Sequence, residues 1–140
     1  MRIIRKEVVI DAPVEKVWEH VTDPGKIAGW LMPNDFEATV GRPFQLDCDQ
    51  EGMISCVVRE LVRLQKLVYS FTSKEIRVET LVTIRLLSED GGTRVILEHS
   101  GWDVLPPSDQ GIADQFENGW VSKLGALQVQ IEIENQIPRR

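Results

Sequence analysis

The side chains best suited to proton transfer in this chain of 140 residues are its two histidines, His20 and His99. Imidazole titrates near neutral pH, so a catalytic triad or a general acid–base pair built on histidine must use one of them. His20 falls on the polar side of an expected helix, which predicts an exposed residue. His99 shares a strand face with Val95 and Leu97, which favours a hydrogen-bonded structural histidine, with proton transfer as the alternative. The sequence contains no Gly-x-Ser-x-Gly elbow, phosphate-binding loop or dinucleotide-binding fingerprint.

Acidic and sulfur-containing side chains offer little for metal binding. Asp47, Asp49 and Glu51 alternate around a turn, but a Ca²⁺ loop needs a longer ligand pattern that includes a glycine. Cys48 and Cys56 lack His or Cys partners at the spacing of a zinc site. We therefore expect no metal and no other cofactor. The two thiols could face each other across a hairpin, but reduced cysteines in a cytoplasmic protein are the preferred interpretation.

The aromatic residues are the stronger indication of a site, because they converge if a curved sheet encloses a long helix. They are Trp18, Trp30, Phe44, Tyr69, Phe71, Trp102, Phe116 and Trp120. Both a packed core and a ligand cavity would explain this convergence. Gly111, Gly119 and Gly125 favour the cavity, since a helical glycine costs about 1 kcal/mol relative to alanine and leaves room for another backbone or for empty volume. Concave apolar pockets with a few polar groups are the usual small-molecule sites.

The element that must position these residues is a long helix predicted over Ser108–Glu134. Its large apolar residues recur every three or four positions: Ile112, Phe116, Trp120, Leu124, Leu127 and Ile131. This spacing is that of one face of an α-helix. Pro106–Asp109 is a start signal, and Pro138 follows the expected end. A helix of about 26 residues would be about 40 Å long, so it needs an extended surface to pack on.

The first part of the chain predicts one strand and two short helices. Ile3–Ile10 is rich in β-branched residues and reads as a strand. Val14–Val21 has an apolar face of helical period. Thr22–Gly25 ends that helix and can cap a shorter one that carries Trp30.

From Phe36 to Ser100 the sequence changes to short alternating runs divided by turn residues, which is typical of an antiparallel meander of about six strands. Asp49–Gly52 and Thr72–Glu75 are predicted turns. Glu89–Gly92 is the strongest hairpin signal, because Asp-Gly and Gly-Gly tolerate the positive φ of tight turns. Antiparallel strands with helices segregated to one face predict an α+β domain over residues 1–140.

Composition excludes several classes of protein. The net charge is −6, from 16 basic and 22 acidic residues, which argues against a nucleic-acid partner. Met1–Ile10 is too charged for a signal peptide, and no apolar run is long enough to span a membrane. We therefore expect a cytoplasmic protein that is not inserted in a membrane.

Several segments together resemble a known superfamily. In chain order they are Val9–Trp18, Val21–Pro24, Trp30, Val40-Gly41-x-x-Phe44, Leu67–Phe71, Gly92–Gly101 and Gly119–Leu127. They resemble the SRPBCC, or START-like, superfamily, and within it the domain homologous to the activator of the heat-shock protein 90 ATPase. The resemblance implies a helix-grip fold, in which a curved antiparallel sheet of about seven strands surrounds a long C-terminal helix and two short helices follow the first strand. Members are carriers or sensors of hydrophobic small molecules, and related branches are cyclases or lipid-transfer proteins.

The sequence departs from the family pattern at three places. Cys56 replaces a glycine, Arg63–Lys66 replaces a Pro-rich turn, and Phe71 replaces a tryptophan. These positions affect strand geometry and cavity lining, so they bear on the ligand more than on the fold.

We therefore predict a single START-like domain that binds a hydrophobic or amphipathic small molecule between the sheet and the long helix, in stress response or transport. The predicted lining residues are Trp30, Phe44, Tyr69, Phe71, Val82, His99, Phe116, Trp120 and Leu124. Tyr69 and His99 are the candidates for orienting a polar end of the ligand.

Two alternatives belong to other functional classes. The first is a protein-interaction module related to chaperone ATPase activators, which would contact a chaperone through an acidic surface and exposed loop aromatics such as Trp102. The second is a cyclase-like enzyme in which His99 assists proton transfer, although strand alternation places Glu98 on the opposite face. Whether the protein is a monomer or a homodimer stays open.

Overall fold

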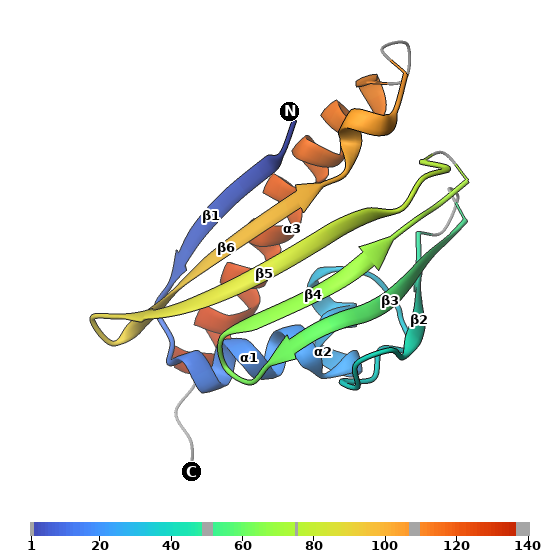
Figure 1. Cartoon of the computed structure of the whole chain (residues 1–140). Coiled ribbons are helices and arrows are strands. Elements are labelled where there is room, and N and C mark those ends of the chain that lie inside the picture. The colour runs from blue at the N-terminus through green and yellow to red at the C-terminus, as the bar shows by residue number, and fades with distance from the viewer. Residues whose placement is uncertain (1, 49–51, 75, 107–109, 137–140) are drawn as a thin grey trace.

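The computed structural model describes residues 2–48, 52–74, 76–106 and 110–136, and it shows a curved antiparallel sheet with a long helix across one face (Figure 1). In chain order the elements are β1 (Ile4–Ile10), α1 (Val14–Thr22), α2 (Pro24–Trp30), β2 (Pro43–Asp47), β3 (Met53–Val62), β4 (Lys66–Phe71), β5 (Thr80–Glu89), β6 (Gly92–Ser100), a short 3-10 helix (Trp102–Val104) and α3 (Gln110–Gln136). The predicted α+β class and helix-grip arrangement are confirmed.

The sheet is an antiparallel meander with the first strand added at one edge. Its strand order is β1-β6-β5-β4-β3-β2, so β1 and β2 are the edges. The hairpin between β5 and β6 turns at the predicted position, with Glu89 paired to Gly92. Asp90 and Gly91 both have positive φ, of 47° and 83°, which is the backbone requirement of a tight two-residue turn.

The described sheet has six strands, so the expectation of about seven is wrong by one. The meander was predicted to start at Phe36, whereas the first strand after the helices starts at Pro43. The intervening backbone closes on itself, because the Thr39 N–H donates to the Glu37 carbonyl over 2.8 Å and Gly41 has a φ of 87°. The segment reaches the sheet only at its end, where the Gly41 N–H donates to the Val58 carbonyl of β3 over 2.7 Å.

Helix α3 has the predicted apolar face and buries it against the rest of the molecule. Trp120, Leu124, Leu127 and Ile131 are 0 to 4% exposed, and Phe116 is half-buried. The helix packs on β1, α1 and α2. The predicted start signal was Pro106–Asp109, of which residues 107–109 lie outside the described residues, as does the end signal at Pro138. Parts of the predicted turns at Asp49–Gly52 and Thr72–Glu75 also lie outside them.

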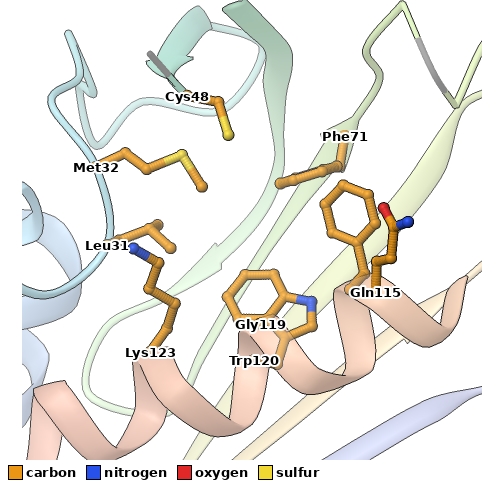
Figure 2. Close-up of a pocket in the computed structure, with 9 residues that line it drawn as sticks. Leu31, Met32, Cys48, Phe71, Gln115, Gly119, Trp120 and Lys123 are labelled. Carbon is orange, nitrogen blue, oxygen red and sulfur yellow. The ribbon is translucent and has the colours of Figure 1, made fainter. Parts of the chain in front are cut away.

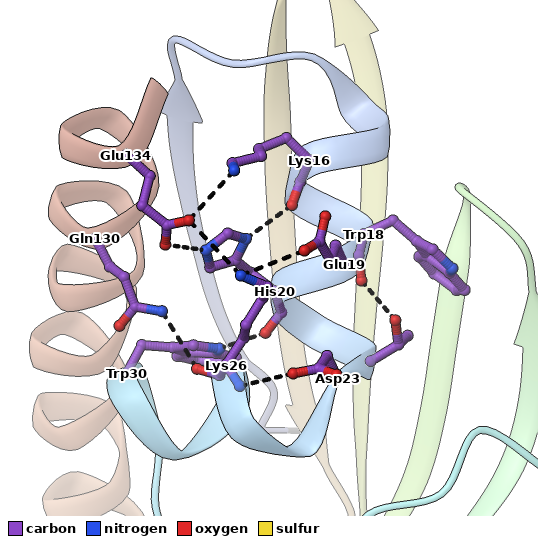
Figure 3. Close-up of polar contacts among 10 residues, drawn as sticks. Lys16, Trp18, Glu19, His20, Asp23, Lys26, Trp30, Gln130 and Glu134 are labelled. Atoms are coloured by element: carbon purple, nitrogen blue, oxygen red, sulfur yellow. Dashed lines mark hydrogen bonds and ion pairs between the residues drawn. The ribbon is translucent and has the colours of Figure 1, made fainter. Parts of the chain in front are cut away.

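The two short helices are fastened to the C-terminal part of α3 by a buried histidine (Figure 3). His20 is fully buried, so the expectation of an exposed helix residue is wrong. Its Nε2 lies 2.7 Å from the Glu134 carboxylate and its Nδ1 lies 2.9 Å from the Lys16 carbonyl. A carboxylate oxygen can only accept, so Nε2 donates to Glu134. Lys16 and His20 of α1 therefore face α3, whereas Glu15 and Glu19 are exposed to water.

Candidate functional site

A cavity of about 200 Å³ lies between α3 and the segments that follow α2 and β2 (Figure 2). Its lining residues are Leu31, Met32, Cys48, Phe71, Gln115, Phe116, Gly119, Trp120 and Lys123. Most of these side chains are apolar, and the exposed Gln115 and Gly119 place the mouth at the protein surface.

Helix periodicity explains how α3 supplies both the wall and the mouth. Phe116 and Trp120 are four residues apart and lie on the same helix face, which is turned inward. Gln115, Gly119 and Lys123 repeat the same spacing along the neighbouring line. A Cβ atom added to Gly119 would meet nothing within 4 Å, so this glycine leaves open space between an amide and an ammonium group.

The inner wall is a cluster of aromatic rings contributed by different elements. Phe71, at the end of β4, packs edge-on against Phe116 with ring centroids 5.5 Å apart. Its ring centroid lies 6.3 Å from that of Trp120. Trp102 packs behind Phe116 at 5.5 Å. Such contacts stabilise the wall beyond the burial of area alone.

His99 holds this wall in place from behind. Trp120 Nε1–H donates to His99 Nδ1 over 3.0 Å, so Nδ1 is an acceptor and the proton of the neutral ring is on Nε2. Nε2 then donates to the Thr80 hydroxyl at 2.8 Å, and that hydroxyl donates to the Phe71 carbonyl at 2.7 Å. The chain of bonds connects α3, β6, β5 and β4.

This arrangement leaves His99 without a free ring nitrogen. Burial lowers the pKa of His99 from 6.5 to about 3, so the ring is neutral near pH 7. The residue does not line the cavity. The geometry therefore favours the structural interpretation of His99, in which it positions Phe71 and Trp120.

A second, much smaller space lies deeper between the sheet and the short helices. Its volume is about 10 Å³, and Trp30, Phe44 and Tyr69 line it together with Leu31. Leu31 also lines the outer cavity and so separates the two spaces. In the described part of the chain the Tyr69 hydroxyl has no hydrogen-bond partner, and burial raises its pKa well above 10.

The structure thus distributes the nine predicted lining residues over three environments. Phe71, Phe116 and Trp120 line the outer cavity, and Trp30, Phe44 and Tyr69 line the inner void. Val82, His99 and Leu124 are buried in the core around them.

Sequence reasoning missed the residues that form the mouth. Leu31 and Met32 directly follow Trp30, at the end of the short second helix, where the sequence pattern indicated no site residue. Gln115 and Lys123 are adjacent in spacing to the predicted apolar stripe, and the signal that could have found them is Gly119 between them. Trp102 was expected to be exposed, but it is fully buried and its Nε1–H donates to the His99 carbonyl at 3.0 Å.

The remaining chemistry of the described residues is limited. No group of three or more His, Cys, Asp or Glu side chains among them could hold a metal ion. Cys48 is half-buried and Cys56 is buried, and burial raises the pKa of the Cys56 thiol. No helix in the described ranges is long and apolar enough to cross a bilayer.

Comparison with known proteins identifies the family. The profile of the family described as Activator of Hsp90 ATPase homolog 1-like protein matches residues 11–132. The chain belongs to this family. Among curated proteins no sequence relative of the chain is found.

Several solved structures share the fold of this chain. Protein MLL2253 from Mesorhizobium loti is 27% identical over 98% of this chain and 100% of its own, with a TM-score of 0.85. Protein BH1534 from Bacillus halodurans is 31% identical over 94% of this chain and 96% of its own, with a TM-score of 0.77. DynU16, a protein in the dynemicin biosynthetic locus, is 25% identical with a TM-score of 0.82, and the match covers 93% of this chain but only 47% of DynU16.

Proposed function

We propose that this protein binds a hydrophobic or amphipathic small molecule in the cavity beside α3. The observation that carries the proposal is the cavity of about 200 Å³ itself, whose inner wall is made of Phe71, Phe116 and Trp120. Burial of apolar ligand surface against such a wall contributes about 25 cal/mol per Å². Transport or stress response in the cytoplasm stays a prediction for this activity.

The size of the cavity limits the ligand. Drug-sized sites have volumes of about 300–1,000 Å³, so a cavity of about 200 Å³ admits a small apolar molecule or one chain or ring of a larger molecule. The likeness to DynU16, from a biosynthetic locus, supports a small-molecule ligand rather than a macromolecular one.

Two glycine substitutions on α3 test whether the cavity is the site. Gly119→Leu places a branched side chain at the cavity mouth, whereas Gly125→Leu places the same side chain on an exposed part of the same helix with open space around it. Each replacement removes a helical glycine and stabilises the helix by up to about 1 kcal/mol. The neutral dye Nile red is the probe, with total tryptophan emission as a second readout, because Trp120 lines the cavity.

We expect Gly119→Leu to weaken Nile red binding at least tenfold and Gly125→Leu to leave it unchanged. Equal binding by both variants would place the dye elsewhere. Failure of the unmodified protein to bind Nile red or any member of a hydrophobic-compound library, with no shift in melting temperature, would contradict the proposed function.

A second candidate function is a protein-interaction module related to chaperone ATPase activators. It is favoured by an exposed apolar stripe on the outer face of α3, where Val121, Val129 and Ile133 are 54 to 57% exposed. The Val129→Glu variant should lose a chaperone in a pull-down if the stripe binds it. An unchanged chaperone ATPase rate with and without the protein would count against this candidate.

The cyclase-like alternative has less support from the geometry. Its proposed acid–base residue is His99, whose two ring nitrogens are engaged by Trp120 and Thr80. If an enzymatic activity is found and the His99→Ala variant retains it, the cyclase-like alternative is wrong.

A further inference from the structure

The acidic side chains of α3 are paired with donors, whereas its one lysine is not. The acidic residues of its described side chains are Asp114, Glu117, Glu132 and Glu134, and each of them accepts a hydrogen bond or an ion pair. Most of the donors come from other parts of the molecule: the chain before β1, β1 itself, the segment after it, α1 and α2. These contacts hold the helix on the rest of the molecule.

Lys123 is the one basic residue between positions 110 and 136, and it takes no part in that pairing. The helix positions three and four residues away are Gly119, Trp120, Ala126 and Leu127. None of these can pair with an ammonium group, so the intrahelical ion pairs that usually accompany a helical lysine cannot form. Among the described residues no ion pair to Lys123 from another element is present either.

This unpaired ammonium lies at the cavity mouth. Lys123 is half-buried, lines the cavity, and extends from α3 towards Leu31 (Figure 2). Gln115 stands at the other end of the mouth, eight residues or about 12 Å away along the helix axis. The open position at Gly119 lies between these two polar groups.

We propose that the ligand is an amphipathic anion, with a carboxylate or a similar acidic group at one end, and that Lys123 binds this group. The inference rests on the proposed function, because the apolar body of the ligand must occupy the cavity for its acidic end to reach the mouth. The pairing gives the site a charge preference in a protein whose net charge is −6. An ammonium beside an apolar wall is a stronger partner for a carboxylate than one in open water.

Three probes with the same alkyl chain separate the two proposals: octanoate, octanol and octylamine. Each is titrated against the whole chain by displacement of Nile red and by protection of Cys48 from an alkylating reagent. Cys48 lines the cavity, whereas Cys56 is buried. We expect octanoate to bind about tenfold more tightly than octanol, and octylamine to bind more weakly than octanol.

The Lys123→Gln variant should remove the preference for octanoate and leave the affinity for octanol unchanged. Arg63→Gln is the matched control, because Arg63 is an exposed cation in the turn between β3 and β4, at the opposite end of β4 from Phe71. Raising the salt concentration should weaken octanoate binding in the unmodified protein but not in Lys123→Gln, since an accessible ion pair is screened.

Equal affinities for octanoate and octanol, or an equal loss of both in Lys123→Gln, would overturn the assignment of an anionic ligand while the cavity stays the proposed binding site. Absence of binding by all three compounds would overturn both proposals.

Discussion

At the scale of single residues, hydrogen-bond partners decide which polar side chains can act on a ligand. His99 and Tyr69 are both deeply buried, yet they differ in their surroundings. His99 has a partner on each ring nitrogen, whereas the Tyr69 hydroxyl has none among the described residues. Lys123 has the charge and the access that both of them lack.

The neutral state of His99 predicts a loss of stability in weak acid. The unfolded chain protonates this residue near its ordinary pKa of 6.5, but burial lowers the pKa to about 3 in the folded protein. Between these values the unfolded chain binds more protons, so the contribution of His99 is complete above pH 6.5 and falls as the pH drops towards 3.

Urea unfolding of the unmodified protein and of His99→Gln measures this contribution. We expect the difference in unfolding free energy between them to shrink as the pH drops from 6.5 to 4.5, before the carboxylates titrate. If the difference in unfolding free energy does not change with pH, the pKa of His99 is the same in the folded and the unfolded protein.

The unpartnered hydroxyl of Tyr69 predicts that its removal is harmless. A buried hydroxyl without a partner costs about 1–3 kcal/mol, so Tyr69→Phe should leave the unfolding free energy unchanged or raise it by about 1 kcal/mol. Chemical denaturation measures the change. A loss of more than about 1 kcal/mol would mean that the hydroxyl has a partner, such as a water in the inner void of about 10 Å³.

At the scale of elements, α3 depends on polar contacts as well as on its apolar face. Glu134 accepts from the buried His20 and lies 3.2 Å from the Lys16 ammonium. These contacts fasten the C-terminal part of α3 to α1 (Figure 3). The hydrogen bond from His20, together with the nearby lysines, lowers the pKa of Glu134 to about 2.

Replacing Glu134 with glutamine should therefore destabilise the protein near pH 7 by about 2 kcal/mol, which is typical of a charge-assisted bond to a buried partner. The carboxylate is ionised above its ordinary pKa of 4.5, and its contribution should disappear as the pH falls through 2. Thermal or urea unfolding at several pH values measures both effects.

Glu60→Gln provides the control for this experiment. Glu60 pairs with Lys66 at the surface, and such pairs contribute about 0–1 kcal/mol. If Glu134→Gln and Glu60→Gln lower the unfolding free energy by similar amounts, the contact of Glu134 with α1 contributes no more than an ordinary surface ion pair.

At the scale of the whole molecule, the strand order predicts a gradient of stability across the sheet. β5 and β6 each pair with a full strand along both edges, whereas β2 contains five residues and has β3 on one edge and an isolated bridge from Leu46 to Asn34 on the other. Amide hydrogen exchange should be slowest in β5 and β6 and clearly faster in β2. Equal protection of β2 and β5 would contradict this gradient.

A ligand should change this exchange pattern locally. Binding in the cavity should slow the amides of Leu31 and Cys48, which lie in the segments that close it, and leave the β5–β6 turn unaffected. Protection confined to the outer face of α3 would instead favour the protein-interaction module.

The sequence by itself determined the long helix, the hairpin at Glu89–Gly92 and the family. These features depend on local patterns. The spacing of Trp120, Leu124 and Leu127 indicates one face of a helix, and Asp-Gly favours the positive φ angles of a tight turn. The strand parity of His99 likewise predicted a buried side chain. The count of about seven strands was wrong because the backbone around Thr39 forms a local turn, which the sequence pattern did not indicate.

Only the tertiary structure decided which residues surround the cavity and what they can do there. Leu31 and Lys123 are distant in sequence, and their meeting depends on how α2 is placed against α3. The same packing buries His20 on a helix face that the sequence pattern marks as polar, because Glu134 supplies its partner from the far end of the chain. The periodicity of apolar residues in the sequence indicates which face of a helix or strand is buried. Which residue packs on that face is decided by contacts between distant parts of the chain.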